Sequence, residues 1–223
     1  MTKRVLLAWS SGKDSAWALQ TLRAYPDVEI VGLLTTLNGA ADRVAMHGVR
    51  HDLLNAQAAV TGLPLTTVSL PDPCSNAEYE RLMAGAVADA LSRGVTHMAF
   101  GDLFLQDVRD YRIRQLRDTG IHPIFPIWAS SELTPAIARQ MIASGIRAII
   151  TCVDTQQLDA EFLGREFDEK LVNDLPSSVD PCGERGEFHT FCFSSPAFGA
   201  SLAVTRGERV VKGQFHFLEL TRR

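Results

Sequence analysis

A loop near the start of the chain combines hydroxyl groups, a glycine and an ammonium group, in the order Ser10, Ser11, Gly12, Lys13, Asp14 and Ser15. Residues 5–9 before it are continuously apolar, which is typical of a strand buried on both faces, and residues 14–24 after it are expected to form a helix. A strand, a tight polar loop and a helix together aim backbone N–H groups and the positive end of a helix dipole at an anion. The hydroxyls add hydrogen-bond donors and the lysine adds charge. We therefore predict that this loop cradles phosphate groups.

The spacing of this loop differs from that of the common P-loop, which has four residues between its first glycine and Gly-Lys-Ser/Thr. Here Asp14 follows Gly12-Lys13, and no glycine lies upstream. The structural alternative is a serine-rich turn in which Ser10 or Asp14 caps the helix. The position of the loop at the carboxyl end of the first strand favours a ligand site, because open α/β sheets bind ligands there.

Two positions farther along could complete a phosphate site. Gly101-Asp102 ends the fourth expected strand, and its carboxylate would face the phosphates. A carboxylate there suits Mg²⁺, which prefers oxygen ligands and substrate phosphates, and the alternative is a turn aspartate. Arg112 lies on a charged helix and could bind a phosphate or a substrate carboxylate through two hydrogen bonds, or remain a solvated surface residue.

A second polar segment, residues 180–190, has the sequence DPCGERGEFHT and precedes a strand-like run. It brings together carboxylates and an imidazole, and a general base has to be such a group within hydrogen-bond reach of the proton that it removes. Loops carry function when a scaffold holds them, so we predict catalytic roles for Glu187 and His189, together with Asp102. The alternative is a solvated loop.

The composition is that of an ordinary globular protein. The chain has 223 residues, of which 46% are hydrophobic and 22% charged, and its formal net charge is −4. This acidic balance argues against a nucleic-acid partner. No apolar run approaches the roughly 18 residues of a membrane span, and no secretion signal precedes the first strand, so we expect a cytoplasmic protein. Its four cysteines form no Cys-x-x-Cys pair and are expected to be reduced thiols.

Strand-like and helical segments alternate over the first half of the chain, which is typical of parallel βαβ units. Strands are expected over residues 5–9, 28–34, 65–70, 96–100 and 123–127, and helices over residues 14–24, 49–60, 75–91 and 108–116. We therefore predict an α/β fold with a doubly wound parallel five-stranded sheet. After residue 128 the pattern changes, and a smaller α+β domain over residues 129–223 is expected to follow the domain over residues 1–128. In this second part we expect a helix over residues 163–175 and a turn at residues 206–208.

The two motifs together resemble those of a known family. The first loop is similar to the SGGxDS loop of the PP-loop ATP pyrophosphatases, with Ser11 in place of the first glycine. The second segment resembles the EGGEFxT motif of the diphthine–ammonia ligase (diphthamide synthase)-like proteins through Glu184, Gly186, Glu187, Phe188 and Thr190. Arg185 replaces a glycine and His189 stands at the variable site, which resembles the bacterial subset. Shorter matches follow the family order at Met46-His47-Gly48, Gly101-Asp102 and Pro126-Ile127-Trp128.

The resemblance implies a fold and an activity. The fold is the HUP type (adenine nucleotide alpha hydrolase-like), with strand order 3-2-1-4-5. The activity is that of a ligase with the cofactors ATP and Mg²⁺: a carboxylate is adenylated, pyrophosphate leaves, and ammonia displaces AMP to form an amide. The carboxylate, on a small molecule or a modified protein side chain, is not identified by the sequence, and ammonia would come from solution or from a partner.

The same resemblance assigns residues to the two domains. Residues 1–128 would bind ATP through the loop over residues 10–15, with the adenine near Leu34 and Thr35. Substrate binding is expected at His47, Arg112, Glu184, Gly186, Glu187 and Thr190.

Two other functions stay open. A nucleotide-binding sensor of the same fold would carry a glycine-rich motif after the fourth strand, where residues 102–106 contain no glycine. A tRNA-modifying PP-loop enzyme would need a basic face and often a reactive cysteine pair, and the net charge and the cysteine spacing both argue against it. The oligomeric state, a homodimer included, is not determined by the sequence.

Overall fold

The first half of the chain forms a mostly parallel sheet. The computed structural model describes residues 2–39, 43–44 and 47–223. Within these residues, parallel strands run in the order β4-β2-β1-β5-β6, and β3 pairs antiparallel with the end of β2. The bounds are Lys3–Ala8 for β1, Val28–Asn38 for β2, Arg43–Val44 for β3, Leu65–Leu70 for β4, His97–Ala99 for β5 and His122–Ile124 for β6. The predicted α/β fold and strand order are confirmed, while the two-residue strand β3 makes the sheet six-stranded rather than five-stranded.

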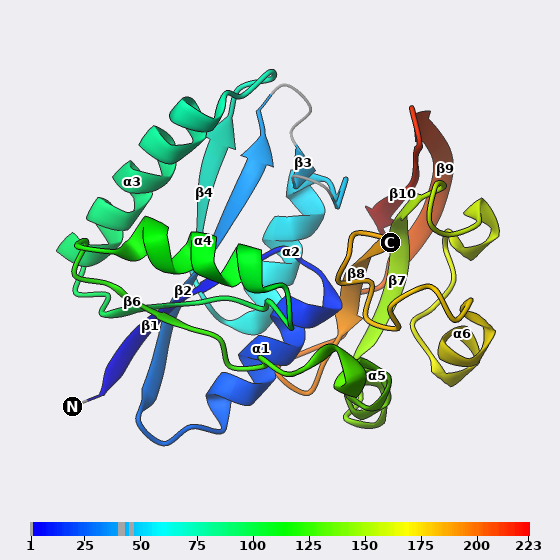
Figure 1. The fold of residues 1–223 in the computed structure, drawn as a ribbon, viewed down its shortest axis with the longest axis horizontal. Helices are drawn as coiled ribbons and strands as arrows, with labels where there is room; N and C mark the ends of the chain where they lie inside the picture. The colour runs from blue at the N-terminus through cyan, green and yellow to red at the C-terminus, as the bar shows by residue number, and fades with distance from the viewer. Residues whose placement is uncertain (1, 40–42, 45–46) are drawn as a thin grey trace.

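Side chains of these strands alternate between the two faces of the sheet, as the two-residue period of a strand requires. Leu7 and Leu33 belong to the core that also contains side chains of α1 (Lys13–Arg23) and α2 (His51–Thr61). Leu6 and Leu34 belong to a second apolar cluster, with side chains of α3 (Asn76–Ser92) and α4 (Gln106–Leu116). The sheet is therefore doubly wound, and α1 and α2 lie between it and a second sheet (Figure 1).

Local signals set the ends of these helices. The Ser75 hydroxyl accepts a hydrogen bond from the backbone N–H of Glu78 at 3.2 Å, as a capping serine does. Gly62 ends α2 with a φ of 72°, a left-handed conformation that suits glycine.

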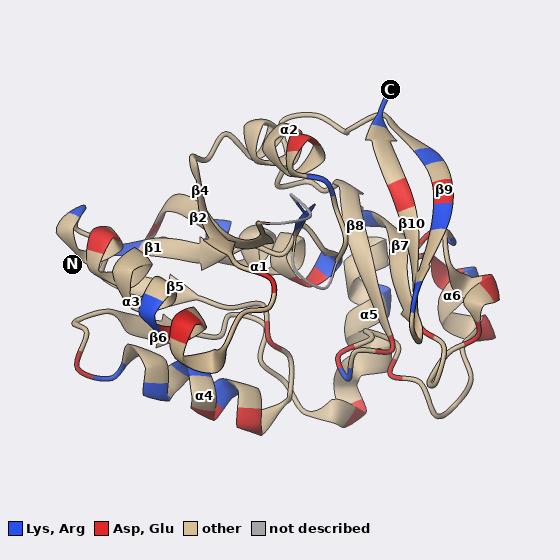
Figure 2. Cartoon of the chain, turned by 90° about the horizontal axis from the view of Figure 1, so that it is seen from above, with Lys and Arg blue, Asp and Glu red and all other residues tan. Residues whose placement is uncertain are grey.

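Basic and acidic residues follow one another along α4 (Figure 2). No helix of the described residues is long and apolar enough to cross a membrane.

The second half of the chain forms an antiparallel sheet in the order β8-β7-β10-β9 (Figure 1). Its strands are β7 (Arg147–Asp154), β8 (Phe188–Ser194), β9 (Val204–Lys212) and β10 (Phe215–Arg222). The helices of this part are α5 (Thr134–Ala143) and α6 (Glu169–Asp174), with short 3-10 turns at Ser131–Leu133 and Ala160–Phe162. This α+β arrangement agrees with the prediction for the region after residue 128.

Two local predictions for this half were wrong. The helix expected over residues 163–175 is confined to α6, because Asp168 caps it by accepting a hydrogen bond from Leu171 N at 2.7 Å. Phe167, just before the cap, instead donates its N–H to Ala148 O of β7 at 2.8 Å. Residues 206–208, where a turn was expected, lie inside β9, and the pairing of β9 with β10 shifts register at this point. The chain reverses at Gly213, which has a φ of 60°.

Buried side chains of both sheets form one core. Phe188 and Phe191 of β8 belong to the same apolar cluster as Leu7 of β1. Gln57 of α2 is fully buried and makes hydrogen bonds to both halves of the chain. Its Nε2 donates to the carbonyls of Ser11 at 3.0 Å and Cys192 at 2.6 Å. Its Oε1 accepts a hydrogen bond from the indole of Trp9 at 2.7 Å. Because the two parts share one apolar core, the domain boundary expected near residue 128 stays a prediction.

We expect Gln57→Leu to lower the free energy of unfolding by about 3 kcal/mol, because it leaves the buried polar groups of Trp9 and Cys192 without their partner. Urea unfolding followed by tryptophan fluorescence measures the change. Gln156→Leu, at an exposed glutamine, is the matched control and should change stability by less than about 0.5 kcal/mol. Equal losses in the two variants would contradict the role given to Gln57.

Candidate active site

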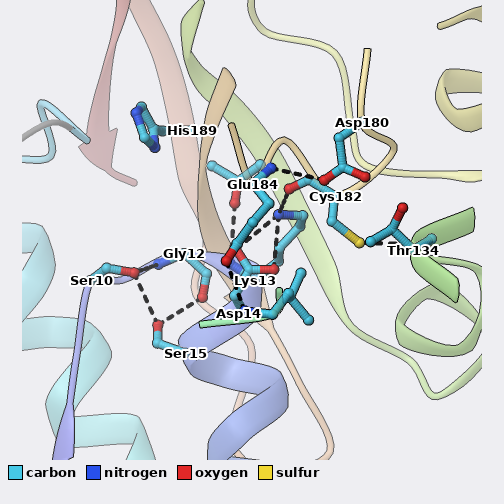
Figure 3. A network of polar contacts seen from close by, with 12 residues as sticks. Ser10, Gly12, Lys13, Asp14, Ser15, Thr134, Asp180, Cys182, Glu184 and His189 are labelled. Atoms are coloured by element: carbon cyan, nitrogen blue, oxygen red, sulfur yellow. Dashed lines mark hydrogen bonds and ion pairs between the residues drawn. The ribbon is translucent and has the colours of Figure 1, made fainter. Parts of the chain in front are cut away.

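The phosphate loop, residues 10–15, joins β1 to α1 through one left-handed residue. Ser11 has a φ of 68°, a conformation that costs a non-glycine residue roughly 1–2 kcal/mol. Gly12 is the N-cap of α1 in an extended conformation, and as a glycine it has no side chain that could cap the helix. Ser10, Gly12 and Ser15 gather at this helix end (Figure 3). The N-cap position is thus held by Gly12 rather than by Ser10 or Asp14, although the Ser10 hydroxyl accepts a hydrogen bond from Gly12 N at 3.3 Å, and the anion site at this helix N-terminus stays a prediction.

Two glycines allow the elements around this loop to approach one another. A Cβ on Gly12 would lie 2.8 Å from Cε1 of His47 and 3.2 Å from the carbonyl oxygen of Thr190. A Cβ on Gly101 would lie 3.2 Å from the backbone of Asp14. The lack of a side chain at Gly12 therefore lets His47 and Thr190 pack against this loop. The lack of a side chain at Gly101 lets the loop after β5 pack against the start of α1.

Strand β8 of the second sheet holds the phosphate loop in place. Lys13 N donates a hydrogen bond to Thr190 Oγ1 at 3.1 Å, and Cys192 N donates to Ser11 O at 2.9 Å. Thr190 belongs to the second motif, so one motif positions the backbone of the other. The structure gives the Thr190 hydroxyl a positioning contact with the backbone of Lys13, and the substrate-binding role predicted for Thr190 stays a prediction.

The Lys13 side chain points into the protein. It is 2% exposed; its ammonium group lies 2.9 Å from an Asp14 carboxylate oxygen and also donates to the carbonyl of Cys182 (Figure 3). The rings of Phe167 and Phe188 each lie 5.4 Å from Nζ. Burial lowers the pKa of this group, but the Asp14 carboxylate and Cys182 more than offset that effect and raise the pKa above its ordinary value. Lys13 is therefore a buried cation that joins the two halves.

A cavity of about 520 Å³ opens beside the loop. Most of the predicted site residues line it: Ser10, Lys13, Asp14, Ser15, Leu34, Thr35, His47, Asp102, Arg112, Glu184, His189 and Thr190. Four predicted residues are not in its wall: Ser11, Gly12, Gly186 and Glu187. Tyr79, Met83 and Phe100 line it but were not predicted, because an apolar residue at helix or strand period signals only a buried position.

Three carboxyl groups from separate elements reach this cavity: those of Asp14, Asp102 and Glu184. Glu184 Oε1 accepts a hydrogen bond from Leu103 N at 2.7 Å, which ties the second motif to the loop after β5. Burial raises the pKa of Glu184 to about 8, and the nearby Asp14 carboxylate adds to the rise. Burial also raises the pKa of Asp102, although Arg112, 3.6 Å away, opposes this. Glu184 can therefore exchange a proton near neutral pH.

The two predicted histidines lie side by side at the cavity wall, with ring centroids 4.8 Å apart. His47 Nδ1 is 3.0 Å from Thr190 O. Burial lowers the pKa of His47 to about 4 and that of His189 to about 3. Within the described part of the chain, Nε2 of His189 is buried without a hydrogen-bond partner. Both rings are neutral at pH 7, so His189 is a weak base, and a hydrogen bond to a ligand suits it better than proton abstraction.

Glu187 occupies a different place from the one its predicted catalytic role requires. Its side chain is 2% exposed. One carboxylate oxygen accepts a hydrogen bond from Asp180 N at 2.9 Å and the other from Arg185 N at 3.0 Å. Gly186 makes the turn before it with a φ of 85°. Glu187 and Gly186 thus shape the second motif from inside, and Glu184 is the glutamate of this motif that faces the cavity.

Asp102, the residue predicted to hold Mg²⁺, lines the cavity, and its Oδ2 lies 3.6 Å from Nε of the positively charged Arg112. Its Oδ2 is buried and, counting only described residues, has no hydrogen-bond partner. The described residues contain no group of three or more His, Cys, Asp or Glu side chains placed to bind a metal ion on their own. A Mg²⁺ at Asp102 would therefore take most of its ligands from phosphate oxygens and water, which is its usual preference. The four cysteines, all of them described, form no disulfide with one another, and their reduced state stays a prediction.

Comparison with known proteins identifies relatives of both halves. Residues 134–223 match the family model described as the diphthamide synthase C-terminal domain. The chain is 26% identical over 230 residues to the diphthine–ammonia ligase of Homo sapiens, which covers 93% of this chain and 85% of that protein. It is 28% identical over 159 residues to the protein of the same name from Mus musculus, with coverage of 69% and 58%. The match to the Rattus norvegicus protein is 31% identical over 113 residues and spans 42% of that protein, so the mouse and rat matches cover less than two thirds of those relatives.

We expect Ser11→Gly to raise the free energy of unfolding by about 1 kcal/mol, because glycine adopts a left-handed φ without strain. The substitution also removes a buried hydroxyl that has no hydrogen-bond partner among the described residues. Urea unfolding measures the gain. Ser10→Gly is the control and should not stabilise, because it removes the oxygen that accepts from Gly12 N. A loss of stability in Ser11→Gly would show that the left-handed residue is not strained.

The stability of the protein should depend on pH through Glu184. The folded-state pKa of about 8 lies above the ordinary value of 4.5, so the stability that the neutral acid provides is complete below pH 4.5 and is lost as the pH rises through 8. We expect Glu184→Gln, which stays neutral, to melt at a higher temperature than the unmodified protein at pH 9, with a difference that vanishes toward pH 5. Thermal unfolding at several pH values tests this. Glu161→Gln, at an exposed glutamate, should show no such trend, and a pH-independent difference for Glu184→Gln would contradict the prediction.

Proposed function

The chain belongs to the diphthine–ammonia ligase-like family of PP-loop proteins, and from this premise we propose that it is an ATP-dependent ligase that joins ammonia to a carboxylate. One observation carries the proposal: the anion site at the start of α1 and the Glu184 carboxyl group, which lie 169 residues or more apart in the sequence, line the same cavity. The cavity thus offers a place for phosphates beside a group that can take a proton.

ATP would lie along the carboxyl ends of the first sheet. Its phosphates would meet the hydroxyls of Ser10 and Ser15 and the N-terminus of α1, where backbone N–H groups and the helix dipole favour negative charge. Its adenine would lie near Leu34 and Thr35, which line the cavity. Asp102 would hold Mg²⁺ against the phosphates. Donors aimed at the departing pyrophosphate stabilise it as charge develops, which favours cleavage between the α and β phosphates.

The carboxyl cluster would handle the ammonia. Ammonium would be attracted to the Asp14 carboxylate, and Glu184 in its ionised form, with a pKa of about 8, would accept one proton from it, because a base with a pKa near the working pH is the most effective. The ammonia so formed would attack the acyl carbon of the adenylate. The bond between that carbon and the AMP oxygen would break and AMP would leave, and the nitrogen would release a second proton to water to give the neutral amide.

The products of ATP cleavage test this proposal. We expect the protein, given ATP, Mg²⁺, ammonium and a carboxylate that it accepts, to release AMP and pyrophosphate in equal amounts, measured by anion-exchange chromatography. Release of ADP and phosphate instead would exclude an adenylating ligase. A nucleotide seen in a crystal away from residues 10–15 would exclude the site.

Substitutions of the two glutamates of the second motif, Glu184 and Glu187, should affect different properties of the protein. We expect Glu184→Gln to lower kcat by about 10²-fold, in the range of losing a general base, while the protein stays folded. Glu187→Gln should instead lower the melting temperature, because a carboxamide cannot accept both backbone hydrogen bonds as the carboxylate does, and activity should recover on cooling. Steady-state pyrophosphate release and thermal unfolding measure the pair. The opposite pattern would restore the catalytic role first predicted for Glu187.

A further inference from the structure

Strand β10 holds the turn that carries His47 from the side away from the cavity. His47 follows the short strand β3 and lines the cavity of the candidate active site. Arg43 of β3 and Glu219 of β10 form an ion pair through two contacts, Nη2 to Oε1 at 2.8 Å and Nη1 to Oε2 at 3.1 Å. Nη1 also donates a hydrogen bond to the carbonyl of Gly48 at 2.8 Å. One guanidinium thus connects β10 to the residue that follows His47.

The geometry of this ion pair favours a fixed position for the turn. A guanidinium that meets a carboxylate through two nitrogens fixes direction as well as distance. The side chains of Arg43 and Glu219 are 27% and 20% exposed, so salt and water weaken their attraction less than they weaken that of a fully exposed pair. The two residues are 176 positions apart in the chain, and each comes from a different sheet. The pair therefore constrains the turn relative to the second sheet.

Gly48 brings the same turn into direct contact with β10. Its φ is 67°, and a Cβ at this position would lie 2.7 Å from Cδ1 of Phe217. A glycine suits both the left-handed backbone and this close approach. Its N–H donates to the carbonyl of Val44 at 3.1 Å and closes the turn. Phe217 and Glu219 are two residues apart on one strand, so their side chains lie on the same face of β10, and the turn rests on that face.

On its inner side the turn presents the His47 imidazole to the cavity. Nδ1 lies 3.0 Å from the carbonyl oxygen of Thr190 in β8, and the carbonyl of His47 accepts a hydrogen bond from the Thr151 hydroxyl of β7 at 3.2 Å. Because a carbonyl can only accept, Nδ1 of the neutral ring carries the proton and Nε2 keeps a lone pair. Such a nitrogen is suited to a ligand group that donates a hydrogen bond, such as a hydroxyl, an amino group or ammonia.

We propose that Arg43 and Glu219 are positioning residues of the candidate active site: Glu219 orients Arg43, and Arg43 holds the turn that places the His47 imidazole in the cavity wall. The inference rests on the proposed function, because it takes this cavity as the active site. It adds strand β10 to the elements on which the site depends. No residue of β10, all of which are described, lines the cavity itself, so the strand acts on the cavity through the turn.

The protonation of His47 tests the inference without any turnover. Long-range ¹H–¹⁵N NMR spectra of the full chain follow the imidazoles between pH 5 and pH 8, and His47→Gln identifies the His47 signals among those of the six histidines. In the unmodified protein burial lowers the pKa of His47 to about 4. We expect Glu219→Gln and Arg43→Gln to let water reach the ring and to raise its pKa by about one unit or more. Glu208→Gln and Arg206→Gln, at exposed positions of β9, are the matched controls and should leave this pKa unchanged.

Two further variants test the order in which the residues act. Because Glu219 is proposed to act through Arg43, adding Glu219→Gln to Arg43→Gln should not raise the pKa of His47 further, as residues of one network are not additive. Arg43→Lys keeps the charge but cannot make the forked contacts of a guanidinium. It should raise the pKa of His47 by less than Arg43→Gln does.

Thermal unfolding of the same variants separates positioning from a purely structural role. A lower melting temperature in Glu219→Gln and Arg43→Gln with an unchanged pKa of His47 overturns the inference, as do additive shifts in the double variant or equal shifts in the controls. If Arg43→Gln does not fold, Glu219→Gln and Arg43→Lys decide the question in the same way. Failure to form AMP with any carboxylate, while the pKa of His47 shifts as expected, would count against the proposed ligase activity alone and leave the positioning of His47 standing.

Discussion

The structure depends on the contact between the phosphate loop and strand β8. Two hydrogen bonds, from Lys13 N to Thr190 Oγ1 and from Cys192 N to Ser11 O, fix the backbone on either side of Gly12. Ser11 is held in a left-handed conformation, and a residue in such a state persists only where its surroundings determine it. The shape of the predicted anion site therefore depends on both halves of the chain, although every residue expected to touch phosphate lies in the first.

The buried Lys13 extends this dependence to charge. Its ammonium lies between Asp14 of the first half and the Cys182 carbonyl of the second, and a buried cation is strongly destabilising when it loses its partners. The second motif therefore cannot move away from the first without exposing or unpairing this charge. The same packing excludes water from Asp102 and Glu184, and burial is the main reason that the pKa values of both carboxyl groups rise. Stability and the chemistry of the cavity thus have a common cause.

Within this frame the two motifs divide the work. The first motif presents hydroxyls and a helix N-terminus, groups that suit a phosphate chain. The second motif presents one carboxyl group to the cavity through Glu184 and uses another, that of Glu187, to hold its own turn. Between them, Arg112 and the neutral pair of His47 and His189 line the wall.

Much of the fold could be read from residues 5–128, because alternating apolar strands and capped helices are local patterns. The resemblance of the sequence to PP-loop proteins predicted the parallel order of the first sheet, which the structure has, and it predicted an anion loop after β1. Only the tertiary structure decided which side chains face the cavity. Glu184 and Glu187 are three residues apart and chemically alike, and what distinguishes them is that Leu103 N reaches one while Asp180 N and Arg185 N hold the other. Lys13 likewise reads as a phosphate ligand, yet it points inward because Phe167, Phe188 and Cys182 surround it. The direction and the burial of these side chains depend on contacts between segments that are distant in the chain, and the spacing of residues along the sequence does not indicate such contacts.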